Sequence, residues 1–156
     1  FRSYIHYPDP DSSLTLNTIS NQQVAILKIF PGITQQTVHA ILNIPNIKAV
    51  VLESYGSGNA PRYDWFHQEL KTAIEKGIII VNRSQCSTGT VEMGRYETSL
   101  NLLTAGVISA NDCTIEAIIT KLMYLTGETN DLDEIKQKLS ISICGEMTED
   151  EKRILG

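Results

Sequence analysis

Two short apolar segments, each followed directly by a polar loop, constrain the fold of this chain more than any other feature. Residues 47–52 lead into a loop over 53–61, and residues 78–81 lead into a loop over 82–90. Both segments are rich in Ile and Val, a pattern that favours strands buried on both faces of a parallel sheet. Because ligands bind outside the carboxyl ends of the strands in open parallel sheets, we predict that function lies at this edge.

The composition fits a single globular domain. The chain has 156 residues, of which 42% are hydrophobic and 20% are charged, so it can bury a sizeable core without disulfides or structural metals. The net charge of −5 argues against a nucleic-acid partner, and no apolar run approaches the length of a membrane span. The three cysteines are widely spaced, which predicts reduced thiols rather than disulfides or a metal site. We predict no cofactor.

The apolar periodicity predicts an α/β fold with three layers, α/β/α, around a mainly parallel sheet of about four strands, in a flavodoxin-like or Rossmann-like small domain. The predicted strands are residues 24–29, 49–52, 78–81 and 107–108. We expect residues 1–23 to be an irregular linker, with at most a weak edge strand around 14–19, and residues 24–156 to form the domain. The chain does not begin with Met, so we expect it to be part of a longer protein.

Capping residues predict where the helices begin. Helices are expected to begin at Thr34, near Arg62, around residue 96 and after Asp112. Asp131 and Thr148 each stand three residues before a Glu, the capping-box spacing that predicts two short C-terminal helices.

The loop at 56–59 contains two glycines but matches neither a Walker loop nor a dinucleotide fingerprint. Two interpretations stay open for this loop. It binds a ligand, or it only shapes a turn in which Asn59 caps the next helix. Glu53 is equally open, since it either orients an ammonium group or marks the point where the strand meets solvent.

The hydroxyl and thiol groups of the second loop do not indicate a nucleophile. Ser84 and Cys86 have no histidine close in sequence, and a Ser or Cys nucleophile needs a base to activate it. His39 and His67 fall on predicted helices, where we expect them to face solvent. A hydrolytic triad inside this chain is therefore not predicted.

The two loops and the segments after them resemble the C-terminal domain of the cytoplasmic, type I L-asparaginase family. The resemblance extends over residues 24–151 and is carried, in order, by residues 49–61, 81–89, 105–108, 114–117 and 120–125.

This resemblance implies that the whole protein hydrolyses L-asparagine to L-aspartate and ammonia. The family's nucleophilic threonine belongs to an N-terminal domain, and residues 87–90, Ser-Thr-Gly-Thr, are not the family's Thr-Gly-Gly-Thr. We therefore expect no catalytic residue in this chain and no activity from it alone. The implied partners are L-asparagine, the N-terminal catalytic domain and further copies in a dimer or tetramer, in the cytoplasm.

In allosteric bacterial members of the family, these two loops hold a second asparagine as an effector. The positions that match this ligand-binding site are Glu53, Ser54, Asn59, Ser84 and Cys86. The resemblance implies an Arg in place of Glu53, so the ligand's carboxylate would meet a like charge and bind weakly. We expect Glu53→Arg to create or strengthen asparagine binding. The alternatives are a stand-alone amino-acid-binding regulatory module and a nucleotide-binding domain.

Overall fold

Four parallel strands form one sheet in the computed structural model, which describes residues 7, 10–14, 16, 19, 23–87, 89–91 and 97–148. The strands are β1 (Val24–Lys28), β2 (Ala49–Ser54), β3 (Ile79–Ser84) and β4 (Ile108–Ser109). They lie side by side in the order β1-β2-β3-β4. The predicted parallel α/β fold is confirmed, although this order is simpler than the reversing order of a flavodoxin.

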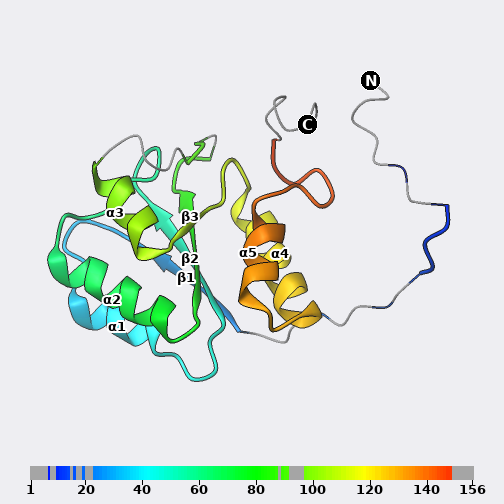
Figure 1. Cartoon of the computed structure of the whole chain (residues 1–156). Coiled ribbons are helices and arrows are strands. Elements are labelled where there is room, and N and C mark those ends of the chain that lie inside the picture. Colours follow the sequence, from blue (N-terminus) through cyan, green and yellow to red (C-terminus); the bar gives the residue numbers. More distant parts are fainter. Residues whose placement is uncertain are drawn as a thin grey trace.

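The helices cover both faces of the sheet, as Figure 1 shows. Helices α1 (Gln35–Leu42), α2 (Asp64–Glu75) and α3 (Glu97–Ala105) lie on one face, and α4 (Ile115–Glu128) and α5 (Leu132–Leu139) lie on the other. Successive right-handed crossovers that advance in one direction place all their helices on one face, which explains the first group. None of the described helices is long and apolar enough to cross a membrane.

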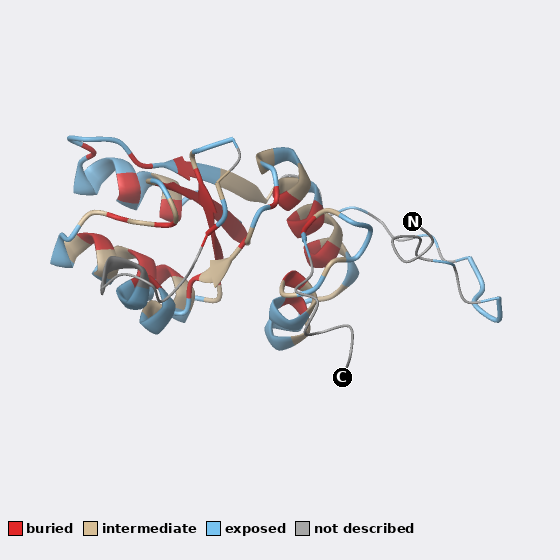
Figure 2. Ribbon diagram, turned by 90° about the horizontal axis from the view of Figure 1, so that it is seen from above, coloured by how far each residue is buried: buried red, intermediate tan, exposed pale blue. Residues whose placement is uncertain are grey.

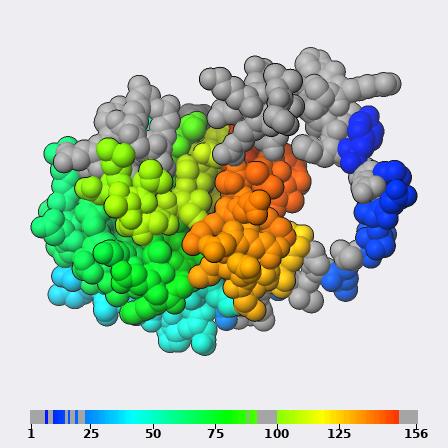
Figure 3. Space-filling model, in the orientation of Figure 1, coloured from blue at the N-terminus to red at the C-terminus, as the bar shows by residue number. Residues whose placement is uncertain are grey.

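The core has two layers separated by the sheet, and Figure 2 shows the buried strands between the two groups of helices. All six residues of β2 are buried. Val50 and Leu52 pack toward α1 and α2, whereas Ala49 and Val51 pack toward α4 and α5. This alternation explains why the sequence of β2 begins as an uninterrupted apolar run. In Figure 3 the residues of α2 (green), α3 (yellow-green) and α5 (orange) lie on the side of the molecule that faces the viewer.

Strands β2 and β3 extend further than predicted. Glu53 and Ser54 continue β2, and Asn82, Arg83 and Ser84 continue β3, in register with each other. Residues that we placed in loops are therefore the last residues of strands. Polar residues are tolerated there because their side chains form hydrogen bonds and an ion pair with neighbouring strands and loops.

Three of the predicted caps can be compared with the structure. Thr34 caps α1 by accepting a 3.2 Å hydrogen bond from the amide of Thr37, as predicted. Asp131 caps α5 as predicted. The prediction for Asp112 was wrong, since Thr114 caps α4 and Asp112 instead accepts a 2.9 Å hydrogen bond from the amide of Thr148. The helix predicted after Thr148 lies outside the described residues.

One further expectation was wrong, that for His67, and the described residues decide two points that the sequence left open. Asn59 does not cap α2, which begins at Asp64 after Tyr63. His67 does not face solvent, since both of its ring nitrogens are buried, and this burial lowers the pKa of the imidazole. Leu14, Leu16 and Ile19, where the sequence allowed at most a weak edge strand, lie outside any strand and are exposed.

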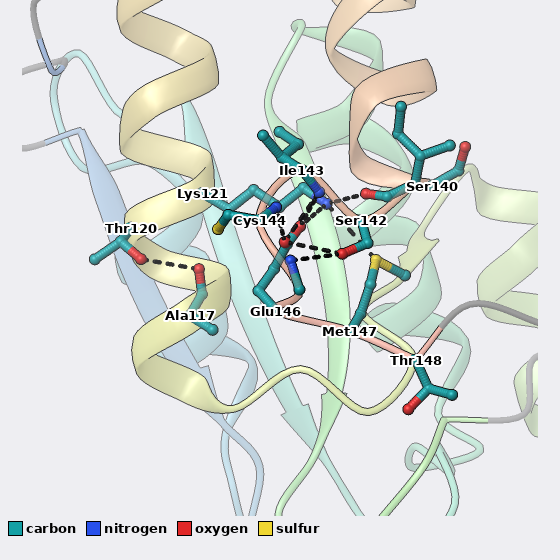
Figure 4. Close-up of polar contacts among 12 residues, drawn as sticks. Ala117, Thr120, Lys121, Ser140, Ser142, Ile143, Cys144, Glu146, Met147 and Thr148 are labelled. Atoms are coloured by element: carbon teal, nitrogen blue, oxygen red, sulfur yellow. Dashed lines mark hydrogen bonds and ion pairs between the residues drawn. The ribbon is translucent and has the colours of Figure 1, made fainter. Parts of the chain in front are cut away.

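The C-terminal segment, residues 140–148, is fastened to α4 by a buried ion pair (Figure 4). Lys121 Nζ lies 2.7 Å from Glu146 Oε1, and the two side chains are 3% and 8% exposed. Lys121 also donates to the carbonyl of Ile141. Glu146 accepts hydrogen bonds from the amides of Ile143 (3.0 Å) and Cys144 (2.8 Å). A cavity of about 460 Å³ opens between α4 and this segment, but the charged groups beside it already bind each other.

Candidate functional site

The ends of β2 and β3 bring both polar loops to one edge of the sheet. The register aligns Glu53 with Arg83 and Ser54 with Ser84. Because successive residues of a strand point to opposite faces, each pair lies on a different face of the sheet. The predicted edge site therefore has two sides, one toward α4 and one toward α2 and α3.

The side toward α4 is a cluster of charges. Arg83 Nη1 lies 3.1 Å from Glu53 Oε1, and the two side chains are about one-tenth exposed. Lys28 Nζ lies 3.6 Å from Glu53 Oε2 and is mostly exposed. Arg83 Nε also donates a 3.4 Å hydrogen bond to the carbonyl of Cys113, just before α4. Glu53 thus has two cationic partners inside this chain, which makes removal of its charge more costly than that of a solvated carboxylate.

Sequence reasoning missed Arg83. The signal that could have found it is the parallel register, in which opposite charges occupy the same position at the ends of two neighbouring buried strands. Gln85 was missed as well. Its side-chain amide donates to the carbonyls of Ile29 (2.6 Å) and Glu53 (2.8 Å), and so it ties the ends of β1 and β2 together.

On the side toward α2 and α3, side chains of β3 hold residues 56–59, the glycine loop, by hydrogen bonds. Asn82 Nδ2 donates to the carbonyl of Gly58 at 3.2 Å, and Ser84 Oγ donates to the carbonyl of Gly56. Ser84 Oγ also accepts a 3.0 Å hydrogen bond from the amide of Cys86. The hydroxyl therefore donates to one backbone group and accepts from another. Neither partner is a histidine, so these contacts supply no base to activate Ser84.

The five predicted ligand residues differ in their access to solvent. Ser54 and Ser84 are fully buried, and Ser54 Oγ donates to the carbonyl of Arg83 at 3.3 Å. Cys86 is exposed, and Asn59 is half-buried in a short bridge with Tyr55. The structure brings Ser54, Ser84, Asn59 and Cys86 to one edge, with Glu53 on the other face of the sheet. Ligand binding by these residues stays a prediction.

A four-stranded parallel sheet with helices on both faces and a braced polar edge defines a three-layer α/β domain. Within the described residues, no group of His, Cys, Asp and Glu could hold a metal ion. The family model of the glutaminase/asparaginase C-terminal domain matches residues 23–139. The chain therefore belongs to this family, and the resemblance inferred from the loops is confirmed.

Relatives in this family carry more than one name. L-asparaginase 1 from Escherichia coli K12 is 41% identical over 144 residues, covering 92% of this chain and 42% of the relative. The human 60 kDa lysophospholipase is 38% identical over 148 residues, covering 94% of this chain and 26% of the relative. The crystal structure of L-asparaginase I from Vibrio cholerae matches with a TM-score of 0.83 and 37% identity, over 90% of this chain and 42% of that one. The chain spans less than half the length of these relatives.

Proposed function

We propose that this chain is the C-terminal domain of a cytoplasmic L-asparaginase, which hydrolyses L-asparagine to L-aspartate and ammonia. The observation that carries this proposal is the match to L-asparaginase 1, which covers nearly the whole of this chain but only 42% of the relative. The rest of the relative leaves room for an N-terminal domain with the nucleophile. In this proposal residues 24–156 are the domain, residues 1–23 link it to the catalytic part, and it supplies oligomer surface and completes a neighbouring active site.

Apolar side chains exposed on the domain support a role in assembly. Phe30, Leu100 and Leu103 are each about half exposed, and apolar side chains of this kind are what the interfaces between subunits bury. We propose that further copies of the protein, in a dimer or tetramer, and the N-terminal domain cover such side chains.

Isolated, the chain should release no ammonia from L-asparagine. The hydroxyl of Ser84 is hydrogen-bonded to backbone groups. The thiol of Cys86 is exposed, and no hydrogen bond to a histidine is found for it among the described residues. The measurement is ammonia release by the purified chain, with a heat-inactivated sample as its control. Turnover above that control would contradict the proposal that the nucleophile lies outside this chain.

We further propose that the carboxyl edge binds an amino-acid effector such as L-asparagine, with Asn59 and Cys86 toward the ligand. Arg83 and Lys28 are cations at this edge, but Glu53 already pairs with both, at 3.1 and 3.6 Å. A ligand carboxylate would have to compete with the carboxylate of Glu53. This competition supports the weak binding that the sequence predicted. It extends the reason given there, because the ligand would compete with Glu53 for Arg83.

Glu53→Arg should therefore strengthen L-asparagine binding in the longer protein, and Glu53→Gln should do so more modestly, by about tenfold or ~1.4 kcal/mol. Both changes remove the competing anion, and Glu53→Gln keeps the shape of the side chain. The measurement is calorimetric titration with L-asparagine. The control is Glu53→Gln combined with Arg83→Met, which should lose the gain. An unchanged affinity in both single variants would contradict the role of Glu53.

A further inference from the structure

We infer that Asn82 and Ser84 form a bracket that fixes the shape of the glycine loop, and that they are positioning residues rather than ligand contacts. The two side chains lie two residues apart on β3 and hold two carbonyls that lie two residues apart in the loop, those of Gly58 and Gly56. This matched spacing fastens the loop to the strand at two points.

Asn82 and Ser84, the two side chains of the bracket, are both buried. Ser84 is fully buried, and a Cβ added at Gly89 would collide with the oxygen and Cβ of Ser84. A Cβ added at Gly58 would lie 3.2 Å from Asn82 Nδ2. The glycines therefore allow the backbone to approach the two side chains closely, and this close packing closes the Ser84 hydroxyl to a ligand unless the loop opens.

The bracket acts on the part of the loop that is half exposed. Between and beside the two held carbonyls lie Ser57 and Asn59, which are both half-buried. The loop is also closed on itself, since the amides of Gly58 (3.1 Å) and Asn59 (2.8 Å) both donate to the carbonyl of Tyr55. Asn82 and Ser84 thus decide where Asn59 is presented. The consequence for effector binding rests on the proposed function, whereas the loop geometry does not.

Amide hydrogen exchange of the ligand-free chain tests the bracket directly. In Ser84→Ala, the amides of Tyr55, Gly58, Asn59 and Cys86 should exchange at least tenfold faster, while the amides of β2 and β3 should change far less. Asn82→Ala should accelerate the same loop amides. Ser87→Ala, which removes an exposed hydroxyl from the neighbouring segment, is the matched control and should leave these rates unchanged.

Two results would overturn the bracket. Unchanged loop exchange in both Ser84→Ala and Asn82→Ala would show that the side chains do not hold the loop. A uniform acceleration over the whole sheet would show general destabilisation instead of local positioning. A second arm measures L-asparagine affinity in the longer protein, where Asn82→Ala should weaken binding about tenfold. If exchange responds but affinity does not, the bracket stands and the proposed effector site fails.

Discussion

Lys121→Ala should destabilise the folded chain by about 3–5 kcal/mol, because it leaves the carboxylate of Glu146 buried without its cation. The ion pair is 2.7 Å long and both side chains are almost fully buried. The substitution also removes the hydrogen bond from Lys121 Nζ to the carbonyl of Ile141. The measurement is urea unfolding followed by circular dichroism, from which the free energy of unfolding is obtained.

Lys138→Ala is the matched control for this prediction. Lys138 pairs with Glu128 and Glu134 at 2.8 and 3.0 Å, but these side chains are substantially exposed, so its loss should be far smaller. A double replacement, Lys121→Met with Glu146→Leu, removes both charges and should recover part of the stability, since the hydrogen bonds to the backbone of residues 141, 143 and 144 stay lost. Equal losses for Lys121→Ala and Lys138→Ala would contradict the importance of burial.

The same pair predicts how stability depends on pH. Burial alone would raise the pKa of Glu146, but hydrogen bonds from Lys121 and from the amides of Cys144 and Ile143 lower it to about 2. A carboxyl whose folded pKa is lowered stabilises the protein above its unfolded pKa, and this contribution is lost as the pH falls toward 2. Unfolding measured between pH 5 and pH 2 should show this loss in the natural chain and much less of it in the double replacement.

Gly58→Ala should cost roughly 2–4 kcal/mol, from backbone strain together with overpacking. Gly58 has φ +112°, a conformation that side-chain-bearing residues rarely adopt, and an added Cβ would lie 2.9 Å from Val91 Cγ1. The same Cβ would lie 3.2 Å from Asn82 Nδ2, so the loop would have to move away from both side chains. Thermal unfolding and the loop's hydrogen exchange measure the two consequences.

Gly56→Ala is the internal comparison, since Gly56 lies in the same loop. Its φ is +51°, and an added Cβ would meet nothing within 4 Å, so only the left-handed backbone is penalised, by about 1 kcal/mol. Equal losses at the two glycines would show that the close approach at Gly58 does not matter.

The sheet was predictable because its signal is local. The runs around 49–52 and 78–81 are apolar on both faces, short and rich in Ile and Val, a pattern that favours a parallel strand covered on both faces. The ends of these strands were missed because they are polar. Glu53 and Arg83 compensate each other across 30 residues of sequence, and that pairing follows from the strand register rather than from either segment alone.

The cap of α4 and the C-terminal segment were mispredicted or missed for a similar reason. Asp112 has the chemistry of an N-cap, but a distant residue, Thr148, takes its carboxylate, and Thr114 caps the helix instead. Lys121 and Glu146 are each ordinary surface residues by type. Their burial is decided by how the segment after α5 packs against α4, which no local pattern encodes.

The most direct measurement of the proposed function is ammonia release from L-asparagine by three proteins: this chain, the N-terminal portion that the proposal places before it, and the two joined. We predict turnover only by the joined protein, because the proposed function assigns the nucleophile to the N-terminal portion and the completion of the active site to this chain. Full activity of the N-terminal portion by itself would contradict the proposed role of this domain, and an inactive, correctly folded joined protein would contradict the asparaginase assignment.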